Sequence, residues 1–325
     1  MRGYHIIGDV HGCAALLEDR LIGLGYRRRG RTGAYIHPDY HAMFVGDLID
    51  RGPQQLETLQ MVKAMVDVGS ASVVMGNHEF NAVAYATKHP SRPGEFLRPH
   101  TEKNDIQHQA FLDQLTPSQQ KYYVGWFKTL PLWRTLKLNG GRARVVHACW
   151  HKPSMRVVRA ACGGKRLSTG QQWALATDRS SDLYQAVEIL LKGPELALES
   201  YGLPGFTDKD GHARDHARIN WWRQGERTLG GLTEKIGGID PDIEVDGHDL
   251  AYVYSGTVPV FFGHHWRKDK PDHSVDFTDH TACVDFSAVN NDAGGGTLVA
   301  YRWQGESTIK HAHYIPHGAA HRESV

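Results

Sequence analysis

Three apolar runs near the start of the chain each lead to a glycine that polar side chains follow. The runs Tyr4–Ile7, Ala42–Val45 and Ala71–Met75 have the character of buried strands, and amphipathic stretches follow the first two. A shorter helix is expected at Phe80–Thr87, after the third run. This alternation of strand and helix predicts a parallel α/β sheet, with the carboxyl ends of its strands meeting at one edge.

Apolar strands are also expected later in the chain, at Arg142–Val146 and Val258–Phe262. Two further segments, Thr281–Phe286 and Thr297–Trp303, are joined by an asparagine- and glycine-rich stretch. We expect these two segments to pair with each other as neighbouring strands.

Residues 151–257 interrupt this pattern of alternating strands and helices. The segment contains a clear amphipathic helix at Asp182–Leu191, but it lacks further strand–helix repeats. We interpret 151–257 as a mostly helical insertion that caps the sheet edge of a single domain covering residues 1–325.

Polar side chains follow every one of the main predicted strands. In chain order they are Asp9, His11, Asp47, Asp50, Arg51, Asn77, His78, His147 and His264. Carboxylate, imidazole and amide ligands suit Mn²⁺, with Fe or Zn²⁺ as alternatives, and do not form an all-oxygen calcium cage. A pair of such ions about 3.5–4 Å apart polarises a phosphoryl group and converts a shared water into a nucleophile.

Two side chains in this set suit phosphate chemistry without binding a metal. Arg51 can form a forked contact with phosphoryl oxygens. His78 can protonate a leaving oxygen if Asp50 holds its other ring nitrogen. The set therefore favours hydrolysis of a phosphate ester.

The composition limits where a negatively charged substrate can bind. Lys and Arg total 37 against 36 Asp and Glu, so the chain has no global field that attracts nucleic acid or an anionic membrane. No apolar run approaches the length of a membrane span, and the first run is too short for a signal peptide. The four cysteines are widely spaced, which favours free thiols and a cytoplasmic location.

The polar motifs resemble those of the calcineurin-like metallophosphoesterases, and in particular their phosphoprotein-phosphatase branch. That branch carries G-D-x-H-G, G-D-x-x-D-R-G and G-N-H-E, followed by two single-histidine motifs. The corresponding segments here are Gly8–Gly12, Gly46–Gly52, Gly76–Glu79, His147 and Gly263–His264. The start of the chain also resembles bacterial diadenosine tetraphosphate hydrolases. The resemblance implies a four-layer α/β/β/α sandwich with metals at the strand ends.

The resemblance also implies a role for each motif residue. The implied ligands are Asp9 and His11 for one metal, Asp47 as the bridge, and Asn77, His147 and His264 for the other metal. The implied substrate contacts are Arg51, Asn77 and His78, with Arg51 as the phosphate clamp and Asp50–His78 as the acid pair.

The chain departs from the family pattern at several positions. His147 precedes Ala148, Cys149 and Trp150, where the family usually has two glycines. The second phosphate-binding arginine of the branch has no clear counterpart here; its candidates are Arg156, Arg218 and Arg223. His265 adjoins His264, and we favour His264 alone as the ligand because adjacent strand residues face opposite ways.

The expected function is hydrolysis of phosphate monoesters, on a phosphorylated protein or a small molecule, by attack of a metal-bridging hydroxide. The alternative is a hydrolase of dinucleoside polyphosphates such as Ap4A. A scaffold that has lost catalysis would lack a ligand, and none is missing. A metallopeptidase would need an H-E-x-x-H helix, which His78–Glu79 does not continue.

Overall fold

Two five-stranded sheets form the centre of the computed structural model, which describes residues 1–207, 213–234, 236, 239–268, 271–273, 275–290 and 295–315. The first sheet has the order β18-β17-β1-β4-β5. Its strands are β1 (Gly3–Ile7), β4 (Tyr40–Phe44), β5 (Ala71–Val73), β17 (Ala300–Trp303) and β18 (Tyr314–Ile315). Strands β1, β4 and β5 are parallel, whereas β17 runs antiparallel to β1.

The second sheet has the order β13-β14-β12-β7-β6 and a similar design. Its strands are β6 (Trp133–Leu138), β7 (Gly141–Val146), β12 (Val260–Phe262), β13 (Phe277–Thr278) and β14 (Thr281–Cys283). The three central strands β7, β12 and β14 are parallel, and an antiparallel strand flanks them on each side.

An apolar layer fills the space between the two sheets. Met43 of β4 and Tyr301 of β17 pack in one buried cluster with Val145 of β7 and Phe261 of β12. Phe44, the next residue of β4, belongs to the other apolar cluster, which includes the helices. Alternate strand residues point to opposite faces, so each sheet buries one face against the other sheet and one against helices.

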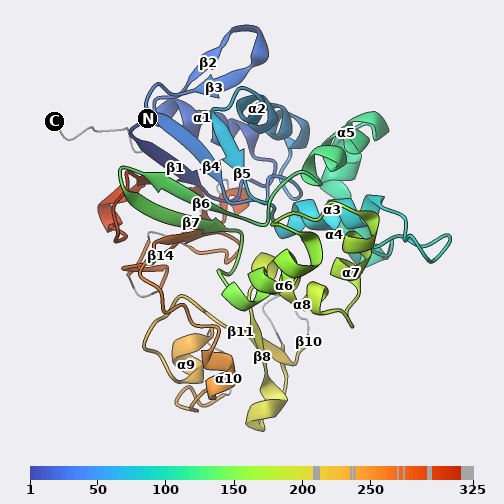
Figure 1. Ribbon diagram of the computed structural model, residues 1–325, viewed down its shortest axis with the longest axis vertical. Coiled ribbons are helices and arrows are strands. Elements are labelled where there is room, and N and C mark those ends of the chain that lie inside the picture. Colours follow the sequence, from blue (N-terminus) through green and yellow to red (C-terminus); the bar gives the residue numbers. More distant parts are fainter. Residues whose placement is uncertain are drawn as a thin grey trace.

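Helices cover the outer faces of the sandwich, as Figure 1 shows with α1 and α2 above the sheets and α6 and α8 below them. The helices of at least eight residues are α1 (Ala14–Gly23), α2 (Gln55–Asp67), α3 (Asn77–Ala86), α4 (Glu102–Gln114), α5 (Pro117–Phe127), α6 (Lys152–Cys162), α7 (Gly170–Thr177) and α8 (Asp182–Lys192). The four-layer α/β/β/α fold is therefore confirmed. No helix among the described residues has the length and apolar character to cross a bilayer.

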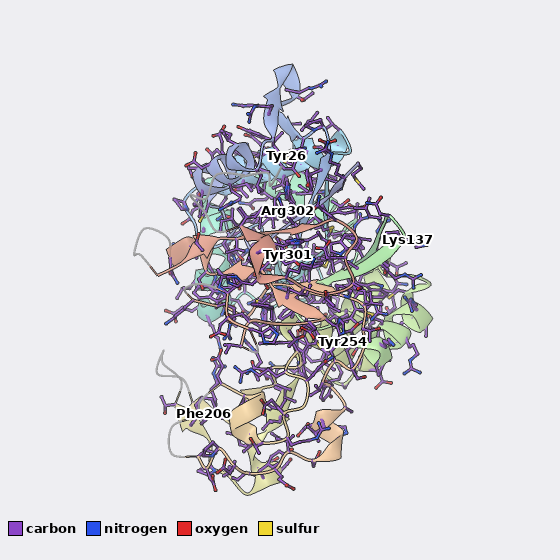
Figure 2. The ribbon with its side chains drawn as sticks, turned by 90° about the vertical axis from the view of Figure 1, so that its left-hand side faces the viewer. Tyr26, Lys137, Phe206, Tyr254, Tyr301 and Arg302 are labelled. Atoms are coloured by element: carbon purple, nitrogen blue, oxygen red, sulfur yellow. The ribbon has the colours of Figure 1, made fainter. Side chains whose placement is uncertain are left out.

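Short elements complete the fold. A hairpin of β2 (Arg27–Arg29) and β3 (Ala34–Ile36) follows α1, and β15 (Asp285–Phe286) pairs with β16 (Thr297–Leu298). After α8 come β8 (Glu195–Ala197), β9 (Phe206–Thr207), β10 (Ala213–Arg214), β11 (His216–Arg218), α9 (Leu229–Leu232) and α10 (Gly247–Leu250). These last elements form a lower lobe in which Phe206 lies far from Tyr301 at the centre of the sandwich (Figure 2). The assignment of 151–257 as a cap stays a prediction.

The parallel sheet expected from the first three runs is confirmed by β1, β4 and β5, whereas β7 and β12 belong to the second sheet. The expected pairing of the last two segments needs correction. Thr281–Phe286 and Thr297–Trp303 pair only at β15 and β16, after which β14 and β17 lie in different sheets. Apolar alternation marks a buried strand but carries no information about which sheet it joins. Residues 291–294 of their connection lie outside the described residues.

Candidate metal centre

Asp47 lies at the centre of the cluster formed by the strand-end side chains. Its Oδ2 is 3.7 Å from His11 Nε2, 3.8 Å from His78 Nε2 and 3.3 Å from His147 Nε2. Two groups of side chains able to hold a metal share this residue: His11, Asp47 and His78, and Asp47, His147 and His264. Within each group, the candidate ligand atoms lie within 4.8 Å of one another.

Asn77 completes the second group. Its Oδ1 is 2.9 Å from His147 Nε2 and 2.8 Å from His264 Nδ1. His147 Nδ1 donates to the Val45 carbonyl oxygen at 2.9 Å, so in the neutral ring the lone pair of Nε2 points toward the amide oxygen; burial lowers the pKa of His147, but Asp47 outweighs burial and raises it overall, which favours a positive charge at this position. Two acceptors facing each other are repulsive until a cation lies between them, and this arrangement therefore fits a metal ion.

Asp9 and His11 each have a buried acceptor atom without a described hydrogen-bond partner. Asp9 Oδ2 accepts a hydrogen bond from the His264 backbone N–H at 2.9 Å, but Asp9 Oδ1 is buried without a partner among the described residues. His11 Nδ1 donates to the Ile49 carbonyl oxygen at 2.9 Å, and its buried Nε2 has no described hydrogen-bond partner, although Asp47 Oδ2 lies 3.7 Å from it. Burying such groups without partners is costly, and a cation held by His11 and Asp47 would relieve that cost at His11; Asp9, although an expected ligand, belongs to neither of the two candidate groups.

The electrostatics of the site also favour cations. Burial raises the pKa of Asp9 well above its usual value, and the charges of Asp285 and Asp47 raise it further. Burial and the charge of Asp47 together raise the pKa of Glu79 to about 7. Burial works in the same direction on Asp47, but His147 and His78 outweigh it and hold the Asp47 pKa well below its usual value. Several buried carboxylates thus compete for too little positive charge.

The pKa values of two histidines favour the neutral form that binds metal. Burial, together with the charge of His78, lowers the pKa of His11 to about 3. Burial and then the positive charge of Arg218 lower the pKa of His264 well below its usual value. Arg218 lies on β11 of the lower lobe. Its effect on the pKa of His264 indicates that its positive charge lies near the second ligand group.

Left-handed backbone conformations are concentrated at this site. Of the eight described non-glycine residues with positive φ, six belong to it: His11, Asp47, Asp50, Arg51, His264 and Trp266. Such conformations cost of the order of 1–3 kcal/mol each and persist only where the surroundings hold them in place. They turn side chains from several loops back toward a common point.

Two buried carboxylates hold these strained loops. Glu79, in the first turn of α3, accepts hydrogen bonds from the backbone N–H groups of Asp47, Leu48 and Gly76 at 2.7–2.9 Å. The first of these contacts joins the loop after β4 to the start of α3. Helix α3 consequently begins at Asn77, earlier than the expected start at Phe80.

Asp285 performs the same task for the loop after β12. It accepts hydrogen bonds from the backbone N–H groups of Trp266 at 2.8 Å and Ser287 at 3.0 Å. The sequence analysis missed this residue. An acid inside the apolar stretch Cys283–Phe286 is the signal that could have found it, because a buried carboxylate requires partners.

The Asp50–His78 pair has a third member that the sequence analysis also missed. Asp50 Oδ2 accepts a hydrogen bond from His78 Nδ1 at 2.6 Å, and its Oδ1 accepts one from His108 Nδ1 at 2.9 Å. Burial raises the pKa of Asp50, but the bonds from His108 and His78 outweigh it and lower the pKa to about 2. No local motif marks His108, since only the packing of α4 brings it to Asp50.

Arg51 is exposed beside the metal-ligand groups, with its guanidinium carbon 4.2 Å from the centre of the Trp266 ring. The indole covers one face of the guanidinium and limits its rotation, while the donor groups at its edge remain available to phosphoryl oxygens. Three other arginines are candidates for the second phosphate-binding arginine. The charge of Arg218 lowers the pKa of His264, Arg223 donates a hydrogen bond to the Gly231 carbonyl oxygen, and Arg156 is exposed on α6.

His265 points away from the ligand groups. Its ring contacts the Trp222 ring edge-on at 4.6 Å and also contacts Phe262. Trp221 and Trp222 are fully buried, and their indole N–H groups donate to the carbonyl oxygens of Ala148 and Val275. These two tryptophans anchor the lower lobe to the sandwich and have no free face for a nucleobase.

Known proteins resemble this chain in sequence and indicate its family. The sequence profile of the family described as Calcineurin-like phosphoesterase matches residues 4–193. A bis(5'-nucleosyl)-tetraphosphatase PrpE (asymmetrical) of Halalkalibacterium halodurans is 47% identical over 76 residues, which cover 23% of this chain and 30% of that protein. The protein of the same name from Bacillus subtilis is 28% identical over 146 residues, covering 45% of this chain and 57% of that protein. The chain thus aligns with only part of each relative.

A solved structure extends the likeness to the whole fold. A serine/threonine phosphatase from Saccharomyces cerevisiae, described as similar to human phosphatase PP5, is 12% identical. It matches 99% of this chain and 81% of its own with a TM-score of 0.52. At this identity the likeness concerns the fold alone.

Proposed function

Because this chain belongs to the calcineurin-like phosphoesterase family and is a phosphoric ester hydrolase, we propose that it cleaves dinucleoside polyphosphates with two divalent metal ions. The observation that carries the proposal is the position of Asp47, shared between two groups of candidate ligands. When bound, a pair of cations withdraws charge from a phosphoryl group and lowers the pKa of a water. We favour Mn²⁺, with Fe or Zn²⁺ as alternatives.

Side chains next to the metal ligands bind the substrate and protonate the leaving group. Arg51 binds the oxygens of the phosphoryl group under attack and meets the charge that develops there. His78 donates a hydrogen bond from its Nδ1–H group to Asp50, which leaves the Nε2–H group to protonate the departing oxygen. Burial lowers the pKa of His78, but Asp47 and Asp50 outweigh it and raise the pKa overall, so the protonated form is favoured.

Dinucleoside polyphosphates rank above phosphate monoesters for two reasons. Several similar relatives carry the name of a bis(5'-nucleosyl)-tetraphosphatase, among them one that is 47% identical over 76 residues. A polyphosphate also needs cations along its length, and Arg51 and Arg218 both act near the ligand groups. This order reverses the expectation from sequence, in which monoester hydrolysis ranked first.

Hydrolysis of phosphate monoesters is the second candidate. It is supported by the motifs Gly8–Gly12, Gly46–Gly52 and Gly76–Glu79, which resemble those of the phosphoprotein-phosphatase branch, whereas the match to a serine/threonine phosphatase structure supports the fold alone. Both candidate reactions assign the same roles to the same residues. They differ only in the group that leaves the phosphorus atom.

A panel of substrates separates the two candidates. Purified protein with Mn²⁺ is given Ap4A, a phosphoserine peptide and p-nitrophenyl phosphate, and kcat/KM is measured for each. We expect Ap4A to be preferred by at least tenfold, and product analysis then distinguishes AMP plus ATP from two ADP. Asp47→Asn should abolish turnover of every substrate, while Lys137→Ala, at an exposed position, should not. Preference for the peptide would replace the first candidate with the second.

A further inference from the structure

Arg98 is a half-buried arginine in the segment between α3 and α4, and it forms no ion pair with a described carboxylate. Its Nη2 group donates to Asn104 Oδ1 at 2.8 Å and to Gln107 Oε1 at 2.7 Å. Its backbone N–H donates to the Ala84 carbonyl oxygen of α3 at 3.0 Å. Arginines away from bulk water are usually paired with acids, so a guanidinium held by neutral amides keeps its charge for another anion.

Helix α4 places this guanidinium beside the acid pair. Asn104, Gln107 and His108 are neighbours on one face of the helix, because residues three or four positions apart lie together. The first two hold Arg98, and His108 Nδ1 donates to Asp50 Oδ1 at 2.9 Å. Burial lowers the pKa of Arg98 while the charge of Asp50 raises it, which agrees with a cation close to that carboxylate.

Three N–H groups of Arg98 remain for a ligand. Nη2 is occupied by the two amides of α4, whereas Nε and Nη1 have no hydrogen-bond partner among the described residues, and neither nitrogen is fully buried. Asp50 does not use them, because each of its oxygens already accepts an imidazole N–H. The side chain is therefore fixed through one nitrogen and open to substrate oxygens through the other two.

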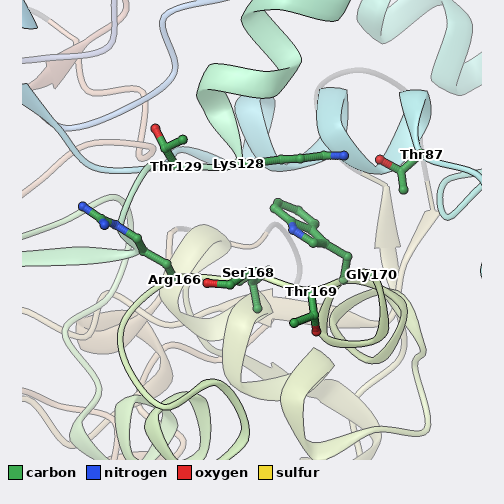
Figure 3. Close-up of a pocket in the computed structure, with 9 residues that line it drawn as sticks. Thr87, Lys128, Thr129, Arg166, Ser168, Thr169 and Gly170 are labelled. Atoms are coloured by element: carbon green, nitrogen blue, oxygen red, sulfur yellow. The ribbon is translucent and has the colours of Figure 1, made fainter. Parts of the chain in front are cut away.

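Other cations near the end of α3 lack this organisation. Lys128 and Arg166 line a cavity of about 390 Å³ there, but their charged ends point away from each other across it (Figure 3). They offer no common ligand position, whereas the amides of α4 hold Arg98 in one orientation near Asp50.

We propose that Arg98 binds the phosphate oxygens of a leaving nucleotide and so favours substrates whose leaving group is itself a phosphate. This inference rests on the proposed function, in which His78 protonates the leaving oxygen, so that a cation beside the Asp50–His78 pair lies next to the leaving group. The alcohol or phenol that leaves a monoester offers no phosphate oxygens to Arg98. Arg51, in contrast, binds the phosphoryl group under attack.

The charge balance of the reaction explains why a fixed cation helps at this position. When the bond between the attacked phosphorus and the bridging oxygen breaks, its electron pair stays on that oxygen. Water supplies the new oxygen on phosphorus, and the bridging oxygen takes the Nε2 proton of His78. Negative charge grows on the leaving phosphate until that proton arrives, and a guanidinium already in place stabilises it.

Variants of Arg98 compared on two kinds of leaving group test the proposal. With Mn²⁺ present, kcat and KM are measured for Ap4A and for p-nitrophenyl phosphate, whose leaving phenol carries no phosphate. Arg98→Gln should lower kcat/KM for Ap4A about 10- to 100-fold, as loss of a hydrogen bond to a charged group does, and that for p-nitrophenyl phosphate only a few-fold. Arg92→Gln is the matched control, since Arg92 lies exposed in the same segment and pairs with Glu95 at 3.2 Å.

Inhibition of p-nitrophenyl phosphate hydrolysis gives a result that does not require Ap4A to be a substrate. Arg98→Gln should raise the Ki of ADP about tenfold, with a much smaller change in the Ki of orthophosphate, which Arg51 binds. Wild type that prefers monoesters would contradict the proposed function. Equal changes for ADP and orthophosphate, or none for ADP, would overturn the role of Arg98.

A purely structural role predicts a different pattern. Loss of the bonds to α4 alone would disturb Asp50 through His108 and lower the turnover of Ap4A and p-nitrophenyl phosphate equally, which would also overturn the proposal. Arg98→Lys keeps a positive charge without the forked donors, so it should retain more of the activity on Ap4A than Arg98→Gln does. It also repeats the comparison should Arg98→Gln not fold.

Discussion

Replacing His108 tests whether the acid pair works as a group of three. Each oxygen of Asp50 accepts one imidazole N–H: Oδ2 from His78 at 2.6 Å and Oδ1 from His108 at 2.9 Å. In His108→Phe the ring and its stacking on Phe111 remain, but the buried Oδ1 loses its donor. The carboxylate is then free to rotate away from His78.

The expected size of the effect follows from the bond that is lost. A hydrogen bond to a charged group contributes about 1.5–3 kcal/mol, and about 1.4 kcal/mol expressed in the transition state changes a rate tenfold. We therefore expect kcat for a substrate with a poor leaving group, such as an alkyl phosphate, to fall about 10- to 100-fold. For p-nitrophenyl phosphate, whose leaving group needs little protonation, the fall should be only a few-fold.

Two matched variants separate orientation from general damage. His108→Asn places an amide donor where Nδ1 was and should restore most of the activity. His100→Phe changes a neighbouring exposed histidine that stacks on Tyr85 without reaching Asp50, and should leave both substrates unaffected. Equal losses for the two substrates in His108→Phe, or no rescue by His108→Asn, would refute the argument.

Acid stability gives an independent measurement of the same contact. The pKa of Asp50 is about 2 in the folded protein, below its ordinary value of 3.8, so its bonds stabilise the fold above pH 3.8. That contribution is lost as the pH falls through 2. With one donor removed, the loss should begin at a higher pH in His108→Phe.

Three further predictions concern the phosphate clamp, the metals and pH. Trp266→Ala removes the ring that packs on the Arg51 guanidinium. The variant should raise KM about 2- to 30-fold, because a cation–π contact contributes about 0.5–2 kcal/mol. An unchanged KM would argue against Arg51 as the phosphate clamp. Chelation should lower the melting temperature and added Mn²⁺ should restore it, because cations relieve repulsion between buried carboxylates; an unchanged melting curve would speak against bound metals. Burial lowers the pKa of His151 to about 4, so wild type should lose stability as the pH falls from 6.5 toward 4. His151→Asn, which keeps an acceptor for the Ser154 N–H, should lose less over that range, and parallel curves would refute the assignment.

Sequence reasoning reached the residues that sit directly after strands and failed where tertiary packing decides. The segments around Asp9, Asp47 and Asn77 carry their own pattern of an apolar strand, a glycine and polar side chains. Those patterns are local, so the strands and their polar ends could be read in order. The placement of β7 and β12 in a second sheet depends on which faces pack together, which no local pattern records.

The supporting residues were harder to identify for a similar reason. His108 lies 58 residues from Asp50 in sequence, and only the position of α4 joins them. Asp285 supports a loop that begins with His264, although one comes from β15 and the other follows β12. A residue that holds another residue in place has no motif of its own, because its partner is fixed by the fold.

Glu79 links the strained loops to the metal ligands, and its replacement tests whether strain and metal binding are coupled. Its two oxygens accept three backbone N–H groups, from Asp47 at 2.9 Å, Leu48 at 2.7 Å and Gly76 at 2.9 Å. In Glu79→Gln one oxygen becomes an NH₂ group that faces a backbone donor. Loss of one such bond in a buried site costs about 1–3 kcal/mol.

Because Asp47 adopts a left-handed backbone, with φ of 50°, it needs this support to stay aimed at both ligand groups. We therefore expect Glu79→Gln to lower the melting temperature and also to weaken Mn²⁺ binding about 10- to 100-fold, as loss of a residue that orients a ligand does. Glu57→Gln, at an exposed position on α2, is the control and should change neither. A variant that is less stable but binds Mn²⁺ as wild type does would show that the loop conformation and the metal centre are independent.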